Sequence, residues 1–376
     1  MKKLSNPFVI GRYAGDYYFC DREKETDFLL KQVENGRDVV LISPRRMGKS
    51  GLISHFFDSD AIKSHYNTLF IDIYSTSTPE EFALLLGRSI IDTVRKDRSL
   101  LRKALDALRT IRPLVKIDAV TGEPALELKA AALEYPEMTL KEIFDYMQAS
   151  ERPYIVAIDE FQQISSYKGF NMEAKLRTFV QSSPNIRFIF SGSEQSMMAE
   201  MFLSSRKPFY QSCITMGLLP IPRDTYRDFA MTLFNDYGKT LSASLFDEVY
   251  SKYEGITWYV QMMLNELFAI SSEGGLLAEN AIAAAEENII GVMGYSYQEM
   301  MARFSPRQRL LMSAMARNPE LCGSLTSASF LKASGFATPA MVQAAVKRLL
   351  KEGVVTRRDG VYTIYDAFFL AWLRQQ

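Results

Sequence analysis

The chain has 376 residues, which is more than one ordinary domain core needs and suits two or three domains. Hydrophobic residues make up 47% and charged residues 23%, and this globular composition excludes a largely disordered or fibrous chain. The formal net charge is zero, so the chain as a whole offers no electrostatic argument for nucleic acid, although residues 303–376 carry 11 Lys+Arg and 4 Asp+Glu.

Membrane and metal-site signals are weak throughout the sequence. No apolar run approaches the roughly 18 residues that a membrane helix needs, and residues 1–19 lack the apolar core of a signal peptide. We therefore expect a cytoplasmic protein without membrane association. Cys20, Cys213 and Cys322 are scattered without a paired motif and do not complete a zinc site with the two histidines, so we interpret these residues as structural.

Short apolar runs and helical patterns alternate along the first 220 residues. Helices are predicted at 79–96, with Thr78 as N-cap and Pro79 in the first turn, and at 140–148 and 173–180. Strands are predicted at 39–42, 68–74, 154–158, 186–190 and 213–218. Apolar strands that alternate with helices indicate a parallel sheet covered on both faces, so the fold class is α/β.

One interruption of this alternation lies between the second and third predicted strands. Residues 114–120 and 124–129 flank the sequence TGEP, which predicts a small inserted hairpin.

The pattern changes after Pro220. Residues 224–290 are almost continuously helical in their apolar spacing, which predicts a helical lid. Ser305 and Pro306 then open a helix, and further helices at 327–333 and 339–351 precede two strand-like runs around Asp359 and Gly360. Three helices and a terminal hairpin predict a winged helix. We therefore expect a core at 1–220, a lid at 221–295 and a winged helix at 296–376.

The loop after the first predicted strand resembles a Walker A phosphate loop. Its sequence SPRRMGKS has Ser43 in place of the first glycine of GxxxxGK[ST]. We expect Gly48 to let the main chain approach phosphate, Lys49 to contact the β- and γ-phosphates of ATP, and Ser50 to ligate Mg²⁺. The predicted nucleotide-binding residues are Ser43, Pro44, Arg45, Arg46, Met47, Gly48, Lys49, Ser50 and Gly51.

Two arginines inside this loop are unusual. The side chains of Arg45 and Arg46 either contact phosphate or a neighbouring domain, or point into solvent while only the main chain serves ATP.

An acidic pair follows the third predicted strand, where YIVAI leads directly to Asp159 and Glu160. This arrangement is typical of a Walker B motif, because a parallel strand brings both carboxylates to the sheet edge that carries the phosphate loop. We expect Asp159 to hold Mg²⁺ and Glu160 to polarise the attacking water. The alternative is an ordinary strand end with a solvated acidic pair.

Candidate residues around the γ-phosphate follow the fourth predicted strand. Ser193, in preference to Ser191, is predicted to orient the attacking water, although a simple strand-ending turn would also explain the sequence. Further along, Arg206 or Lys207 is a candidate arginine finger, from the same subunit or the next, with surface charge as the alternative.

Three segments together carry a resemblance to a known family. These are FCDREKETDFLLKQVENGRDVVLISPRRMGKSGLI, YIVAIDEFQQI and FIFSGSEQSMM, and with them the chain resembles the prokaryotic archaeal-type ATPases of the AAA+ and STAND-like group. The resemblance implies the sheet order 5-1-4-3-2 and places the segment Phe19 to Glu23, with Phe19 and Arg22 as the candidate contacts, near the adenine. It also implies a Gly-x-Pro contact in the lid, but here Thr257 stands where the proline would be.

The role of ATP hydrolysis is open at this stage. One hypothesis is a switch that acts on DNA through basic residues of the winged helix, namely Lys347, Arg348, Lys351, Arg357 and Arg358. The alternative is a regulatory nucleotide-binding module that signals to a protein partner or a second copy of the chain. In that case the winged helix serves only packing or protein contact. A small-molecule kinase is a third class, but no second substrate pocket is evident in the sequence.

Overall fold

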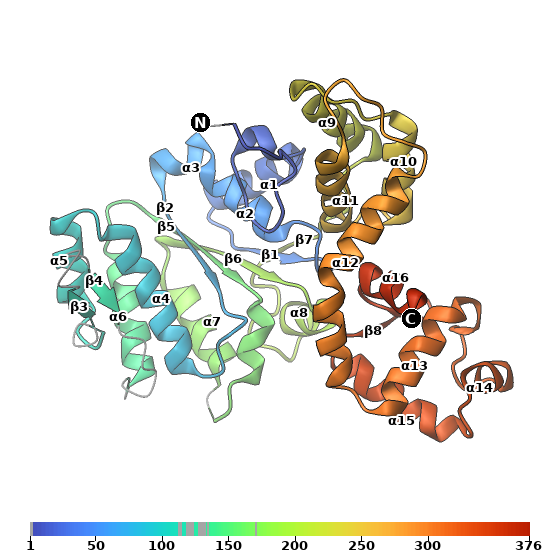
Figure 1. Cartoon of the computed structure of the whole chain (residues 1–376). Helices are drawn as coiled ribbons and strands as arrows, with labels where there is room; N and C mark the ends of the chain where they lie inside the picture. The colour runs from blue at the N-terminus through green and yellow to red at the C-terminus, as the bar shows by residue number, and fades with distance from the viewer. Residues whose placement is uncertain (1–2, 112–114, 118–123, 127–132, 134, 170) are drawn as a thin grey trace. The chain divides into compact units, whose positions relative to one another are not determined.

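A computed structural model of the chain describes residues 3–111, 115–117, 124–126, 133, 135–169 and 171–376 (Figure 1). The chain divides into two compact units, one formed by Gly11–Thr225 and the other by Met1–Ile10 together with Tyr226–Gln376. The lid and winged-helix regions thus share one unit, and the limits expected for three separate domains stay a prediction. None of the helices described is both long and apolar enough to cross a membrane.

A parallel sheet organises the unit Gly11–Thr225. Its strands are β1 (Val39–Ile42), β2 (Asn67–Asp72), β5 (Tyr154–Asp159), β6 (Ile186–Gly192) and β7 (Ile214–Met216). Their order is β2-β5-β6-β1-β7, and every neighbouring pair is parallel. This order confirms the expected 5-1-4-3-2 arrangement. Because β6 lies between β1 and β5, the segments that follow these three strands meet at one edge of the sheet.

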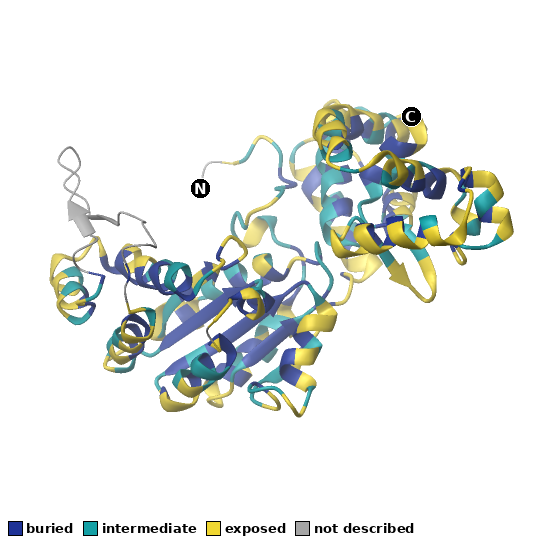
Figure 2. Cartoon of the chain, turned by 90° about the horizontal axis from the view of Figure 1, so that it is seen from below, coloured by how far each residue is buried: buried dark blue, intermediate teal, exposed yellow. Residues whose placement is uncertain are grey.

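Helices cover both faces of this sheet, with α4, α6 and α7 on one side and α1 and α2 on the other (Figure 1). The strands are the most buried part of the unit (Figure 2). Successive side chains of a strand point to opposite faces of the sheet, and both faces are covered by helices. Val40, Val156 and Phe188, for example, belong to the same core cluster as residues of α4 and α6. The helices are α1 (Glu23–Glu34), α2 (Lys49–Asp58), α3 (Asp60–His65), α4 (Pro79–Val94), α5 (Arg98–Ala107), α6 (Pro136–Gln148), α7 (Met172–Ser182) and α8 (Gln195–Leu203), with 3-10 turns η1 (Asp16–Tyr18) and η4 (Phe161–Ser166).

The inserted hairpin lies where it was expected, between β2 and β5. Strands β3 (Val115–Ile117) and β4 (Pro124–Leu126) pair antiparallel. The remainder of the predicted hairpin, including most of the TGEP turn, lies outside the described residues.

The other unit begins as a helical array and incorporates the N-terminal segment. Its first helices are α9 (Arg223–Asp236), α10 (Ala243–Lys252), α11 (Thr257–Ile270) and α12 (Ala281–Ala302), which confirms the helical lid. Phe8 is fully buried in this unit, its ring centroid lies 5.3 Å from that of Phe234, and its carbonyl accepts a hydrogen bond from Asn265. This packing explains why the first residues belong to the unit of the lid.

The winged helix follows in the same unit. It consists of α13 (Pro306–Arg317), η5 (Pro319–Leu321), α14 (Ala328–Ser334), α15 (Pro339–Lys351), the antiparallel pair β8 (Val355–Arg358) and β9 (Val361–Ile364), and α16 (Ala367–Gln375). A capping box at Ser305 opens α13, and Gly335 ends α14 in the left-handed conformation.

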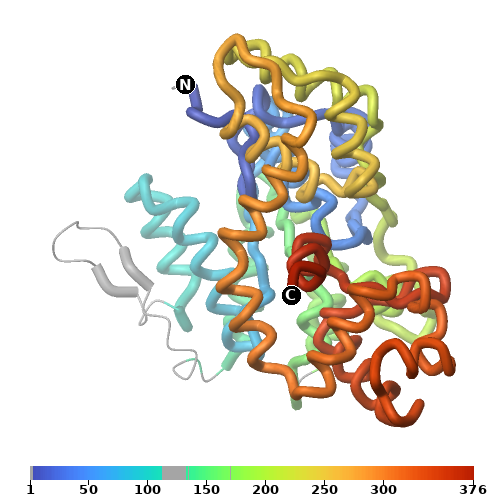
Figure 3. Tube along the Cα trace, turned by 45° about the vertical axis from the view of Figure 1, so that its right-hand side comes forward, coloured from blue at the N-terminus to red at the C-terminus, as the bar shows by residue number. Residues whose placement is uncertain are grey.

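The terminal helix α16 was not expected from the sequence. It packs against α12 and α13, and Figure 3 shows it in red beside the orange helix α12. The hydroxyl of Tyr259 in α11 accepts a hydrogen bond of 3.0 Å from the Ala367 amide, and the Trp372 ring lies 5.9 Å from that of Tyr297. The final helix therefore fastens the winged helix to the lid.

Candidate functional site

The segment between β1 and α2 has the main-chain geometry of an anion-binding loop. Arg46 and Gly48 both adopt positive φ angles, 71° and 91°, and the helix begins at Lys49 with Gly48 as its N-cap. No side chain caps the helix, so the amides of its first turn are not satisfied by a capping group. A helix start of this kind attracts negative charge through its unpaired amides and its dipole.

Lys49 is buried at the centre of this loop. Its side chain donates hydrogen bonds of 2.8 Å to the Ser43 carbonyl and 2.9 Å to the Pro44 carbonyl. Burial lowers the pKa of Lys49, while the nearby carboxylates of Asp159 and Glu160 act in the opposite direction. Phosphate oxygens are stronger acceptors for an ammonium group than these neutral carbonyls.

Ser50 and Asp159 lie in direct contact although they come from different elements. The Ser50 hydroxyl donates a 2.6 Å hydrogen bond to the carboxylate of Asp159 at the end of β5. Hydroxyl and carboxylate oxygens are hard ligands of the kind that Mg²⁺ prefers. No group of three His, Cys, Asp or Glu side chains able to hold a metal occurs in the part of the chain that the structure describes.

A third carboxylate, that of Asp72, lies near those of Asp159 and Glu160 and was not among the predicted site residues. Asp72 ends β2 directly opposite Asp159 in the register of the two strands. Burial raises the pKa of Asp72, and the negative charges of Asp159 and Glu160 raise it further. Asp72 lies inside the strand predicted at 68–74, and it is the earlier end of β2 in the structure that places it at the edge of the sheet.

Glu160 occupies an unusual main-chain conformation at the start of η4. Its φ of 55° lies in the left-handed region, which a non-glycine residue adopts only at some cost. The Oε2 atom of Glu160 accepts a 2.8 Å hydrogen bond from the Ser193 hydroxyl and another from the Gln162 amide. Ser191, in contrast, is fully buried within β6, and its hydroxyl has no partner among the described residues.

Arg45 connects the phosphate loop to this same region. Its Nε donates to the Ser193 hydroxyl at 3.2 Å, and its terminal nitrogen pairs with Glu194 at 2.7 Å. The Arg45 side chain therefore does not simply extend into solvent. Arg46, whose φ is also positive, is partly buried in the loop.

Phe19 and Arg22 differ in how they relate to the loop. The Phe19 ring stacks on His55 at 4.4 Å, and a ring atom lies 3.5 Å from where a Cβ on Gly51 would be. Phe19 thus lies against the first turn of α2. The buried Arg22 guanidinium instead donates to Glu25 at 2.6 Å and to the Leu219 carbonyl at 2.9 Å.

Neither candidate for the arginine finger, Arg206 or Lys207, forms a hydrogen bond or ion pair with Asp159 or Glu160 among the described residues. Arg206 is exposed in the connection between α8 and β7, and no hydrogen bond joins it to Lys49 or Glu160 within the described chain. Lys207 forms ion pairs with Glu173 and Glu200.

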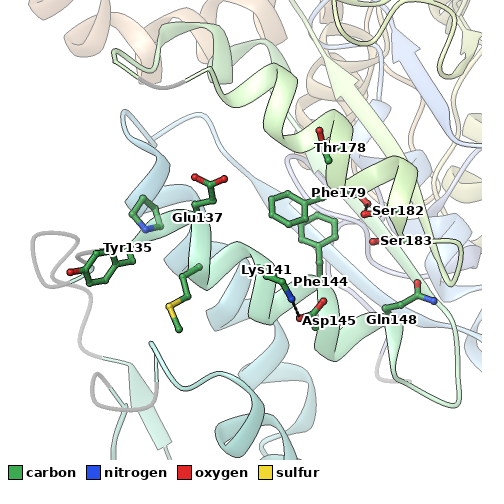
Figure 4. Close-up of a pocket in the computed structure, with 12 residues that line it drawn as sticks. Tyr135, Glu137, Lys141, Phe144, Asp145, Gln148, Thr178, Phe179, Ser182 and Ser183 are labelled. Atoms are coloured by element: carbon green, nitrogen blue, oxygen red, sulfur yellow. Dashed lines mark hydrogen bonds and ion pairs between the residues drawn. The ribbon is translucent and has the colours of Figure 1, made fainter.

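A groove of about 740 Å³ lies elsewhere in this unit, between α6 and α7 (Figure 4). Its charged side chains pair with near neighbours, such as Lys141 with Asp145, and Glu137 with Lys175 outside the groove lining. The stacked rings of Phe144 and Phe179 are part of its lining. Its lining includes the first turn of α6 but none of the residues predicted for the phosphate loop or the acidic pair.

The comparison with family profiles identifies the family of the chain. A family profile described as "ATPase domain predominantly from Archaea" matches residues 19–263, which is more than half of the chain. The chain belongs to this archaeal-type ATPase family. A second profile, described as a probable winged helix domain, matches residues 295–375. The protein is therefore an archaeal-type ATPase with a winged helix domain.

Solved structures agree with this archaeal-type fold. A Walker-type ATPase of Pyrococcus abyssi is 20% identical, with a TM-score of 0.65 over 98% of this chain and 99% of the other. The ORC2 protein of Aeropyrum pernix is 13% identical, with a TM-score of 0.59 over 98% and 95% of the two chains. The ORC1 protein of that organism is 11% identical, with a TM-score of 0.55 over 95% and 93%. No curated protein sequence matches the chain.

The first prediction concerns Lys49. We expect Lys49→Ala to weaken ATP binding about 10- to 100-fold, because an ammonium-to-phosphate hydrogen bond contributes about 1.5–3 kcal/mol. Titration with a fluorescent ATP analogue measures this change. Lys141→Ala, which removes an exposed lysine of the same unit, serves as the control and should leave the affinity unchanged. Equal affinities for Lys49→Ala and the wild type would refute nucleotide binding at this loop.

Proposed function

We propose that this archaeal-type ATPase binds ATP with Mg²⁺ at the loop 43–51, hydrolyses it with Glu160 as general base, and acts on the DNA backbone through its winged helix. The observation that carries the catalytic part is a convergence at one sheet edge. The Ser50 hydroxyl lies 2.6 Å from Asp159, and the Ser193 hydroxyl lies 2.8 Å from Glu160.

The binding role rests on the loop and on Lys49. In this proposal the main-chain amides that follow Arg46 hold the β-phosphate, and Lys49 exchanges the Ser43 and Pro44 carbonyls for phosphate oxygens. The Ser50 hydroxyl and the Asp159 carboxylate would hold Mg²⁺, which would supply positive charge beside the phosphates during hydrolysis.

The catalytic role rests on Glu160. Its carboxylate accepts a proton from the attacking water, and Ser193 holds that carboxylate in place. Arg206 remains the proposed source of positive charge for the transition state, supplied to this site or to that of a second copy. Its exposure suits a role in trans better than a contact within its own unit.

The adenine site is proposed next to Phe19. Its ring lies against Gly51 in the first turn of α2, so an adenine beside that turn would meet an aromatic face. Arg22 holds the segment that follows Phe19 in place through its hydrogen bonds to Glu25 and to the Leu219 carbonyl.

The second prediction tests the general base. Glu160→Gln should leave ATP affinity intact and reduce turnover about 100-fold or more, which is the usual contribution of a positioned base. Steady-state phosphate release measures the change. Glu151→Gln, at the opposite end of the strand segment that carries Glu160, should turn over like the wild type. Wild-type turnover of Glu160→Gln would exclude Glu160 from the mechanism.

The DNA part of the proposal rests on the exposed face of α15. Val342, Val346 and Leu349 bury the inner side of this helix, which leaves Lys347 and Lys351 exposed. Neither lysine has an ion-pair partner within the described residues, so both are available to phosphate groups.

The neighbouring arginines are more constrained. Arg348 pairs with Glu352 at 2.7 Å, and Arg358 approaches Glu254 at 3.6 Å. Arg357 bonds to the Gly360 carbonyl in the wing. The face offers few side chains that read base edges, so we propose contact with the DNA backbone rather than sequence recognition. The ORC1 protein of Aeropyrum pernix, which shares this fold, was solved in complex with DNA.

The third prediction follows from this face. The double variant Lys347→Ala/Lys351→Ala should weaken DNA binding to a similar extent for different sequences. The slope of log affinity against log salt should fall by about two, one for each lost phosphate contact. Lys96→Ala/Lys103→Ala removes the same charge from exposed positions of the other unit and serves as the control.

Fluorescence anisotropy with duplexes of different sequence measures both variants. Equal losses in the two double variants would exclude α15 as the DNA contact. If DNA leaves the ATPase rate unchanged while nucleotide drives assembly with a protein partner or a second copy, the regulatory alternative holds instead.

A further inference from the structure

A buried glutamine lies directly behind the proposed general base. Gln162 is the second residue of η4 and is 6% exposed. Its amide nitrogen donates to Oε2 of Glu160, but its carbonyl oxygen has no hydrogen-bond partner among the described residues. An unsatisfied buried acceptor costs stability, so a side chain that serves only the core would not be expected to keep one.

The packing around Gln162 keeps its amide in one place. A Cβ added to Gly192 would lie 2.4 Å from the Gln162 carbonyl oxygen and 2.5 Å from the sulfur of Met198, which is itself fully buried. Gly192 ends strand β6 and is not among the glycines with positive φ. A side chain at position 192 would therefore collide with the Gln162 and Met198 side chains, and both would have to move to make room for it.

Glu160 needs such support because of its own conformation. Its left-handed main chain turns it out of the strand β5 that precedes it. Ser193 and Gln162 both donate to the Oε2 atom, whereas Oε1 accepts no hydrogen bond from a described residue. The two donors therefore hold Oε2 in place, and Oε1 can still accept a hydrogen bond from a water molecule.

We propose that Gln162 is a positioning residue, which holds Glu160 so that Oε1 faces the attacking water. This rests on the proposed role of Glu160. The water oxygen bonds to the γ-phosphorus, the bond from that phosphorus to the β–γ bridging oxygen breaks, and the water proton passes to Oε1. Gln162 neither gives nor takes a proton and acts only through the orientation of the carboxylate.

The adjacent glutamine provides a matched control. Gln163 belongs to the same turn, but its amide donates to the Thr76 carbonyl at 2.9 Å and to the Ser166 hydroxyl at 3.2 Å. The Gln163 side-chain amide therefore also donates hydrogen bonds, but none of them goes to the Glu160 carboxylate.

The fourth prediction separates positioning from structure. Gln162→Met keeps the length of the side chain and removes the donor. It should lower kcat about tenfold or more, because a hydrogen bond to a charged group is lost, while ATP affinity stays within about twofold. Gln163→Met should retain wild-type turnover. In a Glu160→Gln background, Gln162→Met should have little further effect, because both changes act on one group.

Three results would overturn the proposal: wild-type turnover of Gln162→Met, a loss of ATP affinity that matches its loss of turnover, or an undiminished effect in the Glu160→Gln background. The second result, accompanied by a lower thermal midpoint, would assign Gln162 to the core. Wild-type turnover of Glu160→Gln would instead refute the role of Glu160 as general base. The two proposals can therefore fail separately, because the Gln162 variants test only the positioning of Glu160.

Discussion

The hydrogen bond from Ser50 to Asp159 joins two segments that lie 109 residues apart in the chain. It exists because parallel strands deliver the residues that follow them to one edge of the sheet. The intervening strand β6 brings Ser193 to the same edge, between the loop after β1 and the turn after β5. Ser193 can therefore accept a hydrogen bond from Arg45 and donate one to Glu160.

This edge concentrates polar groups at a cost to stability. Lys49 and Asp159 are both about 6% exposed, and the Ser191 hydroxyl and the Gln162 carbonyl oxygen lack partners among the described residues. Glu160 adds a left-handed main-chain conformation. Strained and unsatisfied groups of this kind tend to gather at functional sites, where an incoming substrate supplies the missing partners. The apolar residues of β5, which are buried along the whole strand, supply part of the stability that permits them.

Much of the fold could be predicted from sequence because its signals are local. Apolar runs such as 154–158 and the Gly48-Lys49-Ser50 loop between a strand and a helix require no knowledge of distant contacts. The terminal helix α16 was missed although Asp366 caps it and its apolar residues have helical spacing. The pairing of Phe8 with the lid had no local signal, because it depends on contacts across more than 200 residues of chain.

The site was predictable in its motifs and not in its supporting contacts. Asp159 and Glu160 follow directly from their place after an apolar strand. Neither the link from Arg45 to Ser193 nor the approach of Gln162 to Glu160 can be derived from spacing. The first depends on how the loop after β1 lies beside the end of β6, and the second depends on the conformation of η4. Gly192 was not among the predicted site residues, and the space that it leaves for the Gln162 and Met198 side chains is visible only in the structure.

The structure of the full chain with a non-hydrolysable ATP analogue and Mg²⁺ is the most direct test of nucleotide binding at the loop 43–51. We predict that Lys49 leaves the Ser43 and Pro44 carbonyls for the phosphates, and that the metal binds the Ser50 hydroxyl at about 2.1 Å beside Asp159. An analogue bound away from this edge, or bound while Lys49 keeps both carbonyl contacts, would contradict the account.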